Sequence, residues 1–175
     1  SSNLTEEYGG TSWTNGGNLA SGREYIGGCG TQTAGLAIGG YPRPNGGIKT
    51  EEYNGTSWTA GGNYPEIVFN SGSCGVQTAA LNFGSGDGPG IVTKEYDGTS
   101  WTAGGNMNNA KQSLAGAGTQ TAGLAFGGSP VSGSAGAFTE LYDGSSWTNG
   151  GNLNLARRYL AGNGTQTAAL AIGGS

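Results

Sequence analysis

Large apolar residues alternate with small or polar ones in a short segment that recurs along the chain. In its last copy, Gln166–Ile172, one face of the predicted strand carries Leu170 and Ile172, because successive side chains of a strand point to opposite sides. The earlier copies place large side chains at the same positions: Leu36 and Ile38, Leu81 and Phe83, Leu124 and Phe126. The opposite face holds mainly glycine, alanine or asparagine. Each predicted sheet therefore has a bulky side and a shallow side. If the bulky side of one sheet packs on the shallow side of the next, the contact is head-to-tail, and repeating it by rotation closes a ring. This pattern favours a ring of sheets over a two-sheet sandwich.

This strand belongs to a unit that the chain contains four times. Its four tryptophans are 45, 43 and 46 residues apart, and four tyrosines keep the same spacings. A period of this size is typical of a propeller or another repeat array, in which one unit alone cannot bury its apolar faces. We therefore expect a single domain over residues 1–175, with repeats near 5–49, 50–92, 93–138 and 139–175.

Each repeat divides into four predicted strands. In the fourth repeat these are Thr139–Tyr142, Ser145–Thr148, Arg157–Ala161 and Gln166–Ile172, with tight turns at Asp143-Gly144 and Asn163-Gly164. We expect a type I′ turn at Asp143-Gly144. The chain opens with the tyrosine and tryptophan strands of one repeat and ends with the other two strands of another. The pattern thus predicts three whole sheets and two half-sheets, which pair to close a four-bladed all-β propeller.

The composition narrows the function. Only 10% of residues are charged and the net charge is −4, so the chain lacks the basic surface that binds nucleic acid or anionic membranes. The apolar runs are too short to span a bilayer. Histidine is absent, which removes the commonest general base and transition-metal ligand. Cys29 and Cys74 hold equivalent positions, where they form either a disulfide near the axis or free, small, buried thiols, and we favour the free thiols. We predict no enzyme, no metal site and no cofactor.

The order of residues within a repeat resembles the kelch repeat: a basic residue, an apolar strand ending in Gly-Gly, a tyrosine, then a tryptophan in a hairpin. The marks are Arg157, Gly173-Gly174, Tyr142 and Trp147; Lys111, Gly127-Gly128, Tyr96 and Trp101; and Arg23, Gly39-Gly40, Tyr8 and Trp13. The second repeat departs, with Val68 and Gly84-Ser85. The resemblance implies a β-propeller. Kelch propellers usually have five to seven blades, so four repeats leave open a tight ring or a larger ring shared by two chains.

The kelch resemblance also implies roles for the aromatic and basic residues. The tyrosines and tryptophans are expected to wedge between neighbouring blades: Tyr8, Trp13, Tyr53, Trp58, Tyr96, Trp101, Tyr142 and Trp147. Three basic residues precede the strand that would line the central channel: Arg23, Lys111 and Arg157. They form either an anion-binding ring at the channel mouth or bonds to loop carbonyls, and we favour the second interpretation. The charged residues before each tyrosine are expected to be solvated outer-strand charges: Glu6-Glu7, Glu51-Glu52, Lys94-Glu95 and Glu140.

The repeat sequence TSWTAGGN…GTQTAGLAFGG is also similar to low-charge kelch-like repeats in structural proteins of marine bacteriophages. This resemblance implies a virion-associated or extracellular location. The favoured function is a non-enzymatic binding or structural module, an adhesin that recognises a glycan or a protein surface. The alternatives are a purely structural module that assembles with itself or other virion proteins, and a glycan hydrolase with a shallow carboxylate site.

Recognition on such a scaffold is expected on the variable loops, which emerge on one face. These loops are 41–49, 85–92 and 129–138, and the predicted contact residues are Tyr41, Arg43, Asn45, Lys49, Asp87 and Phe138. The segment Tyr64–Phe69 breaks the repeat pattern by introducing Pro, Tyr and Phe. Either these residues fill the core, or Tyr64 is exposed on the same face and anchors a ligand. Tyr64 is therefore a seventh predicted contact residue.

Overall fold

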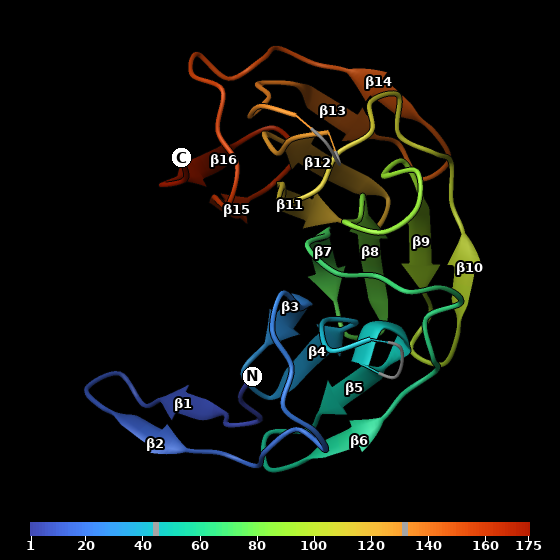
Figure 1. The fold of residues 1–175 in the computed structure, drawn as a ribbon. Coiled ribbons are helices and arrows are strands. Elements are labelled where there is room, and N and C mark those ends of the chain that lie inside the picture. The colour runs from blue at the N-terminus through green and yellow to red at the C-terminus, as the bar shows by residue number, and fades with distance from the viewer. Residues whose placement is uncertain (44–45, 131–132) are drawn as a thin grey trace.

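The computed structural model describes residues 1–43, 46–130 and 133–175. Within these ranges the chain forms sixteen β-strands and one short 3₁₀ turn, η1 (Gly46–Ile48). The strands make three four-stranded antiparallel sheets and two two-stranded ones (Figure 1). The all-β, propeller-like arrangement predicted from the repeats is therefore present.

Strands follow one another in chain order within every sheet. The complete sheets are β3 (Gly27–Thr31), β4 (Ala34–Ile38), β5 (Thr50–Tyr53) and β6 (Trp58–Ala60); β7 (Gly72–Val76), β8 (Ala79–Phe83), β9 (Thr93–Tyr96) and β10 (Trp101–Ala103); and β11 (Ala115–Thr119), β12 (Ala122–Phe126), β13 (Thr139–Tyr142) and β14 (Trp147–Asn149). The two-stranded sheets are β1 (Glu6–Tyr8) with β2 (Trp13–Asn15), and β15 (Ala161–Gly164) with β16 (Ala169–Ile172).

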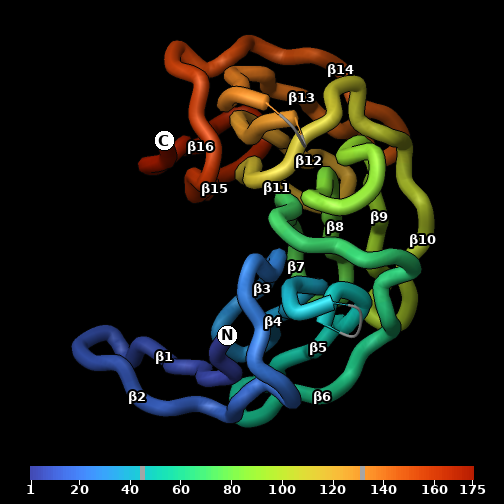
Figure 2. Tube along the Cα trace, in the orientation of Figure 1, coloured from blue at the N-terminus to red at the C-terminus, as the bar shows by residue number. Residues whose placement is uncertain are grey.

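The sheets are arranged around an axis as an open arc rather than a closed ring. The innermost strands β3, β7, β11 and β15 lie beside one another in that order, and the β1–β2 and β15–β16 sheets stand at the two ends (Figures 1 and 2). Within the described ranges the two half-sheets do not pair, so the expected four-bladed closure is wrong for this structure. The turn from one sheet to the next depends on side-chain packing between sheets, and here it leaves the ends apart.

Bulky faces do pack on shallow faces, as the alternation predicts. Leu81 and Phe83 are fully buried between the second and third complete sheets. A Cβ atom added to Gly123 would lie 2.7 Å from the Leu81 Cδ2 atom, and one added to Gly116 would lie 2.7 Å from the Phe83 Cζ atom. Only glycine permits so close an approach, which explains the small residues on the shallow face.

The innermost strand begins later than predicted. In the fourth repeat β15 starts at Ala161, so Arg157–Leu160 belongs to the connection before it, and Asn163-Gly164 lies in the strand rather than in a turn. Glycine-rich sequence is a poor strand signal, which is why the prediction is wrong. Close packing near the axis demands it: a Cβ atom on Gly162 would lie 2.5 Å from the Gly116 carbonyl oxygen.

The hairpin turn before each tryptophan is also wider than predicted. Tyr142 pairs with Trp147, and of the two residues expected at positive φ only Gly144 adopts it, at 93°. The loop is therefore not a two-residue type I′ turn. The Asp143 carboxylate instead accepts hydrogen bonds from the backbone N–H groups of Ser145 and Ser146. These bonds lower the pKa of Asp143 to about 2.

Tyrosines and tryptophans connect neighbouring sheets in three of the four repeats. Trp147 Nε1 donates to Thr93 Oγ1 of the preceding sheet at 2.9 Å, and the Tyr142 hydroxyl donates to Glu95 at 2.6 Å. The equivalent pairs are Trp101 with Thr50, Tyr96 with Glu52, Trp58 with Thr5, and Tyr53 with Glu7. Tyr8 and Trp13 differ, because they are 49% and 65% exposed at the end of the arc.

Candidate binding site

The variable loops and the linkers between sheets meet on one face of the arc. The β4–β5 connection approaches the linker that leads into β3, where Tyr41 N donates to the Glu24 carbonyl oxygen at 2.8 Å. The β12–β13 connection makes the equivalent contact, with Gln112 N donating to the Ser129 carbonyl oxygen at 2.8 Å. Variable side chains from separate repeats are thereby brought to a common surface.

A run of backbone hydrogen bonds around the axis holds this face together. Four equivalent linker residues adopt left-handed backbone conformations: Tyr25 (φ 58°), Asn70 (φ 54°), Ser113 (φ 55°) and Tyr159 (φ 56°). The N–H of each of the last three donates to the carbonyl oxygen of the one before it, at 3.0, 2.6 and 2.9 Å. A tyrosine with positive φ is strained, and such strain is characteristic of functional sites.

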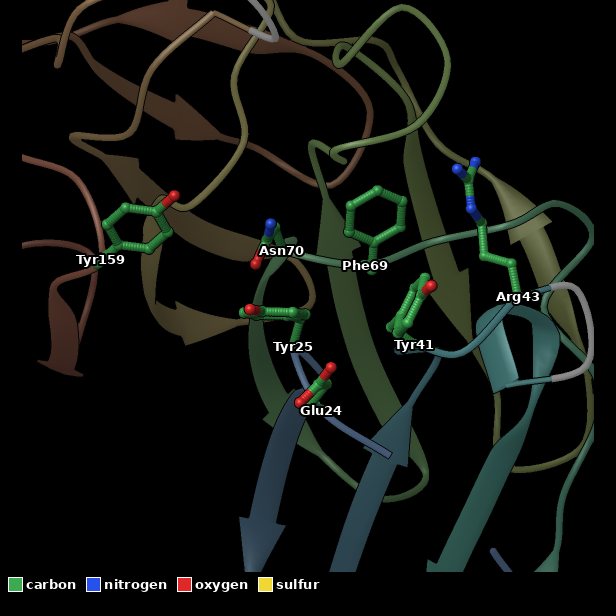
Figure 3. A pocket seen from close by; sticks show the side chains of 7 residues that line it. All are labelled: Glu24, Tyr25, Tyr41, Arg43, Phe69, Asn70 and Tyr159. Atoms are coloured by element: carbon green, nitrogen blue, oxygen red, sulfur yellow. The ribbon is translucent and has the colours of Figure 1, made fainter. Parts of the chain in front are cut away.

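Three of these four left-handed residues, all except Ser113, line a cavity of about 430 Å³. Its lining residues are Glu24, Tyr25, Tyr41, Arg43, Phe69, Asn70 and Tyr159. Figure 3 shows Tyr159 at one end and Arg43 at the other, with Tyr25, Phe69 and Tyr41 between them. Three linkers and one variable loop contribute these side chains, so the cavity spans several repeats.

The cavity combines exposed aromatic rings with a few polar groups. Tyr25, Tyr41 and Tyr159 are 56%, 45% and 60% exposed, which is unusual for three aromatic residues gathered in one place. The Arg43 guanidinium carbon lies 5.5 Å from the centre of the Phe69 ring, as in a cation–π contact. Arg43 also pairs with Asp87 at 3.2 Å in an exposed salt bridge, the kind that adds little stability.

The structure brings together some of the predicted contact residues. Tyr41 and Arg43 line the cavity, and Asp87 lies at its edge against Arg43. Lys49 is half-buried, and its Nζ atom donates to Ser21 Oγ at 3.0 Å. Phe138 is exposed but lines a different depression beside Lys111. Asn45 lies outside the described residues.

Tyr64 is not a surface residue. It is only 3% exposed, and its ring centre lies 4.9 Å from that of Trp101 in the core. Burial raises the pKa of its hydroxyl group. The hypothesis that Tyr64 is an exposed anchor is therefore wrong. Tyr64 and Val68 fill core space, whereas Phe69 of the same segment lines the cavity.

Sequence reasoning missed Tyr25, Asn70 and Tyr159, and it singled out Phe69 only as part of the irregular segment Tyr64–Phe69. A signal was present, because Tyr25, Asn70, Ser113 and Tyr159 occupy the same position, two residues after the basic residue or its replacement Val68. The residue type changes from repeat to repeat at a position whose neighbours are regular. The backbone at this position requires only a residue that tolerates positive φ. The first and last repeats nevertheless have a tyrosine at it.

The basic residues predicted near the channel mouth are mostly structural. Arg23 is buried, donates to the carbonyl oxygens of Gly39 and Lys49 at 2.7 and 3.1 Å, and pairs with Glu51 at 2.7 Å. Burial lowers the pKa of Arg23, and the Glu51 charge opposes that shift. Arg23 is therefore not available to an anion, and the anion-ring alternative is wrong at this position.

Lys111 has the same role in the third complete sheet. It is buried, donates to the Phe138 carbonyl oxygen at 3.3 Å and pairs with the fully buried Glu140 at 3.0 Å. In the part of the chain that the structure describes, Arg157 keeps the carbonyl bond, to Gly173 at 3.0 Å, without an ion pair. Glu51 and Glu140 are consequently buried ion-pair partners, which corrects the expectation that they are solvated.

Cys29 and Cys74 are free thiols beside the axis. Burial raises the pKa of both thiols to about 12, so they are protonated at neutral pH and weak nucleophiles. Among the residues that the structure describes, no group of three or more potential metal ligands comes together.

Comparison with known proteins adds no relative. No protein-family model matches the chain, and no curated protein matches it. In the described parts of the chain, no helix has the length and apolar character needed to cross a membrane.

Proposed function

We propose that this chain is a non-enzymatic, kelch-like propeller module that recognises a glycan or a protein surface on the face formed by its linkers and variable loops. A virion or cell-surface location suits such a module. The cavity that contains Tyr25, Tyr41 and Tyr159 is the recognition site in this proposal. Its volume of about 430 Å³ falls within the range of small-molecule sites and suits a short saccharide or a protruding side chain.

The observation that carries the proposal is that three exposed tyrosines line one cavity. Tyr25 and Tyr159 have left-handed backbone, and the backbone of Tyr41 is hydrogen-bonded to that of Glu24. A tyrosine ring provides an apolar face for stacking and a hydroxyl for hydrogen bonding, and it loses little entropy on binding. Tyr25 and Tyr159 occupy left-handed positions that cost free energy for a bulky residue. Asn70 and Ser113 satisfy the same backbone position elsewhere, so the fold does not require tyrosine there.

The test uses substitutions that the chain itself contains at equivalent positions. Tyr25→Asn and Tyr159→Ser copy Asn70 and Ser113, and therefore keep the backbone conformation. The labelled protein is screened on a glycan array, and the best glycan is titrated calorimetrically. We expect each variant to melt at or above the wild-type temperature and to bind about tenfold or more weakly, as for loss of an aromatic hot spot.

Phe138→Ala is the matched control, because it removes an exposed aromatic side chain outside the cavity. It should bind like the wild type. A glycan that binds all four proteins equally would place recognition elsewhere. An array without any signal would contradict glycan recognition.

A further inference from the structure

The strands at the two ends of the arc each have one edge without a partner. In every complete sheet the second strand pairs with the third, as β12 does with β13. Among the described residues, β16, equivalent to the second strand, pairs only with β15, and β1, equivalent to the third, pairs only with β2. Following the β12–β13 register, β16 and β1 would align Ile172 with Thr5 and Ala171 with Glu6. The two ends are therefore halves of one sheet with open edges.

Charge complementarity links the same two ends. Arg23 pairs with Glu51, and Lys111 pairs with Glu140, each joining the segment before the first strand to the third strand of one sheet. The equivalent residues at the ends of the arc are Arg157 and Glu6. Arg157 already makes the carbonyl bond that Arg23 makes, but no ion pair with an acid is formed in the described chain.

A glutamine contact is also half made. Gln77, Gln120 and Gln166 each donate through Nε2 to two carbonyl oxygens, one on the second and one on the third strand of the preceding sheet. Among the residues that the structure describes, Gln32 donates through Nε2 to the Tyr8 carbonyl oxygen alone, at 3.3 Å. The acceptor that it lacks corresponds to the carbonyl of Ala169, on β16.

The apolar surface repeats this pattern. Each internal tryptophan donates to a threonine at the start of the third strand of the preceding sheet, as Trp58 does to Thr5 at 2.9 Å. Trp13 has no such partner in the described chain, and the threonine equivalent to its missing acceptor is Thr139. Trp13 and Leu170 are each 65% exposed, although their equivalents in the complete sheets are mostly covered.

We propose that β16 of one copy of the chain pairs with β1 of a second copy, so that two copies complete the sheet. The two ends lie apart across the opening of the arc (Figures 1 and 2). Closure within one chain would change the junctions between successive sheets, which are built from the repeated Trp–Thr and Tyr–Glu bonds. A second copy makes the missing contacts and leaves these junctions unchanged. Because every copy carries both halves, the contact is head-to-tail.

The test is a charge exchange between copies, read by sedimentation velocity across protein concentrations. Wild-type protein should associate reversibly. Glu6→Arg alone and Arg157→Glu alone each oppose like charges at the junction and should weaken association about thirtyfold or more. An equimolar mixture of the two variants should restore it, because every contact between unlike copies then joins opposite charges. Glu66→Arg, which makes the same charge change on an exposed residue away from both ends, is the control.

Circular dichroism establishes that each variant is folded before it is mixed. The mixture separates the proposal from closure within one chain, because an internal ring gains nothing from a second variant. Wild-type protein that stays monomeric at all concentrations would overturn the proposal. So would a mixture that associates no better than its two components.

Discussion

Replacing Glu140 tests whether the buried charges hold the third complete sheet together. Glu140 is fully buried and accepts hydrogen bonds from Lys111 Nζ at 3.0 Å and from the backbone N–H groups of Asn108 and Asn109 at 2.7 and 3.2 Å. Glu140→Gln removes the charge and keeps one acceptor oxygen, so it serves one of the two backbone donors, which bond to different oxygens of Glu140. Lys111, itself buried, is then left as an uncompensated cation.

The expected cost is large for a single-atom change. Removing one partner of a buried ion pair typically costs about 3–5 kcal/mol, and a chain of this size loses about 2–4 °C in melting temperature per kcal/mol, so Tm should fall by roughly 6–20 °C. Adding Lys111→Met should recover most of this loss because it removes the orphaned charge. The second complete sheet supports this expectation, since Val68 replaces the basic residue there and is fully packed.

Urea unfolding of the wild type, both single variants and the double variant forms a double-mutant cycle that measures the coupling. The pH dependence supplies a second measurement. Burial lowers the pKa of Lys111, and Glu140 opposes that shift, so the pKa should fall further in Glu140→Gln. A lysine with a lowered folded-state pKa binds fewer protons than in the unfolded chain, so the penalty should shrink as pH rises. A double variant no more stable than Glu140→Gln would refute this reasoning.

Three further predictions concern the hairpins and the packing between sheets. Burial and a bond to Glu95 raise the pKa of Tyr142 to about 12, so unfolding free energy should fall as pH rises from about 10 to 12, and less steeply in Tyr142→Phe. Asp143→Asn should keep the loop conformation, because Asn54 makes the same backbone bonds in another repeat. The lowered pKa of Asp143 predicts that the wild type loses stability as pH falls from about 4 to 2, and the variant should lack this loss. An unchanged dependence of the unfolding free energy on pH in this range would contradict the prediction. Gly116→Ala should lower the melting temperature, because its Cβ atom would lie 2.7 Å from the Phe83 Cζ atom, and a neutral effect would mean that the sheets can separate.

Much of the architecture follows from local sequence. The alternation in Gln166–Ile172 and its equivalents predicted the second strand of each sheet, and the repeat spacing predicted the order of strands and the half-sheets at both ends. The variable loops also predicted Tyr41 and Arg43 as surface residues, and both line the cavity that we propose as the recognition site. These features depend on contacts within a repeat or on a period of two residues, which a single sequence records directly.

Three features were decided by the tertiary structure. The arc stays open, and Glu51 and Glu140 are buried. Tyr25 and Tyr159 line one cavity, although they lie in the first and last repeats. The open arc and the shared cavity depend on the rotation and spacing between successive sheets, and the burial of the two glutamates depends on the linker that covers the third strand. Those quantities are set by how side chains of different repeats pack against one another, a long-range property that no pattern inside one repeat encodes.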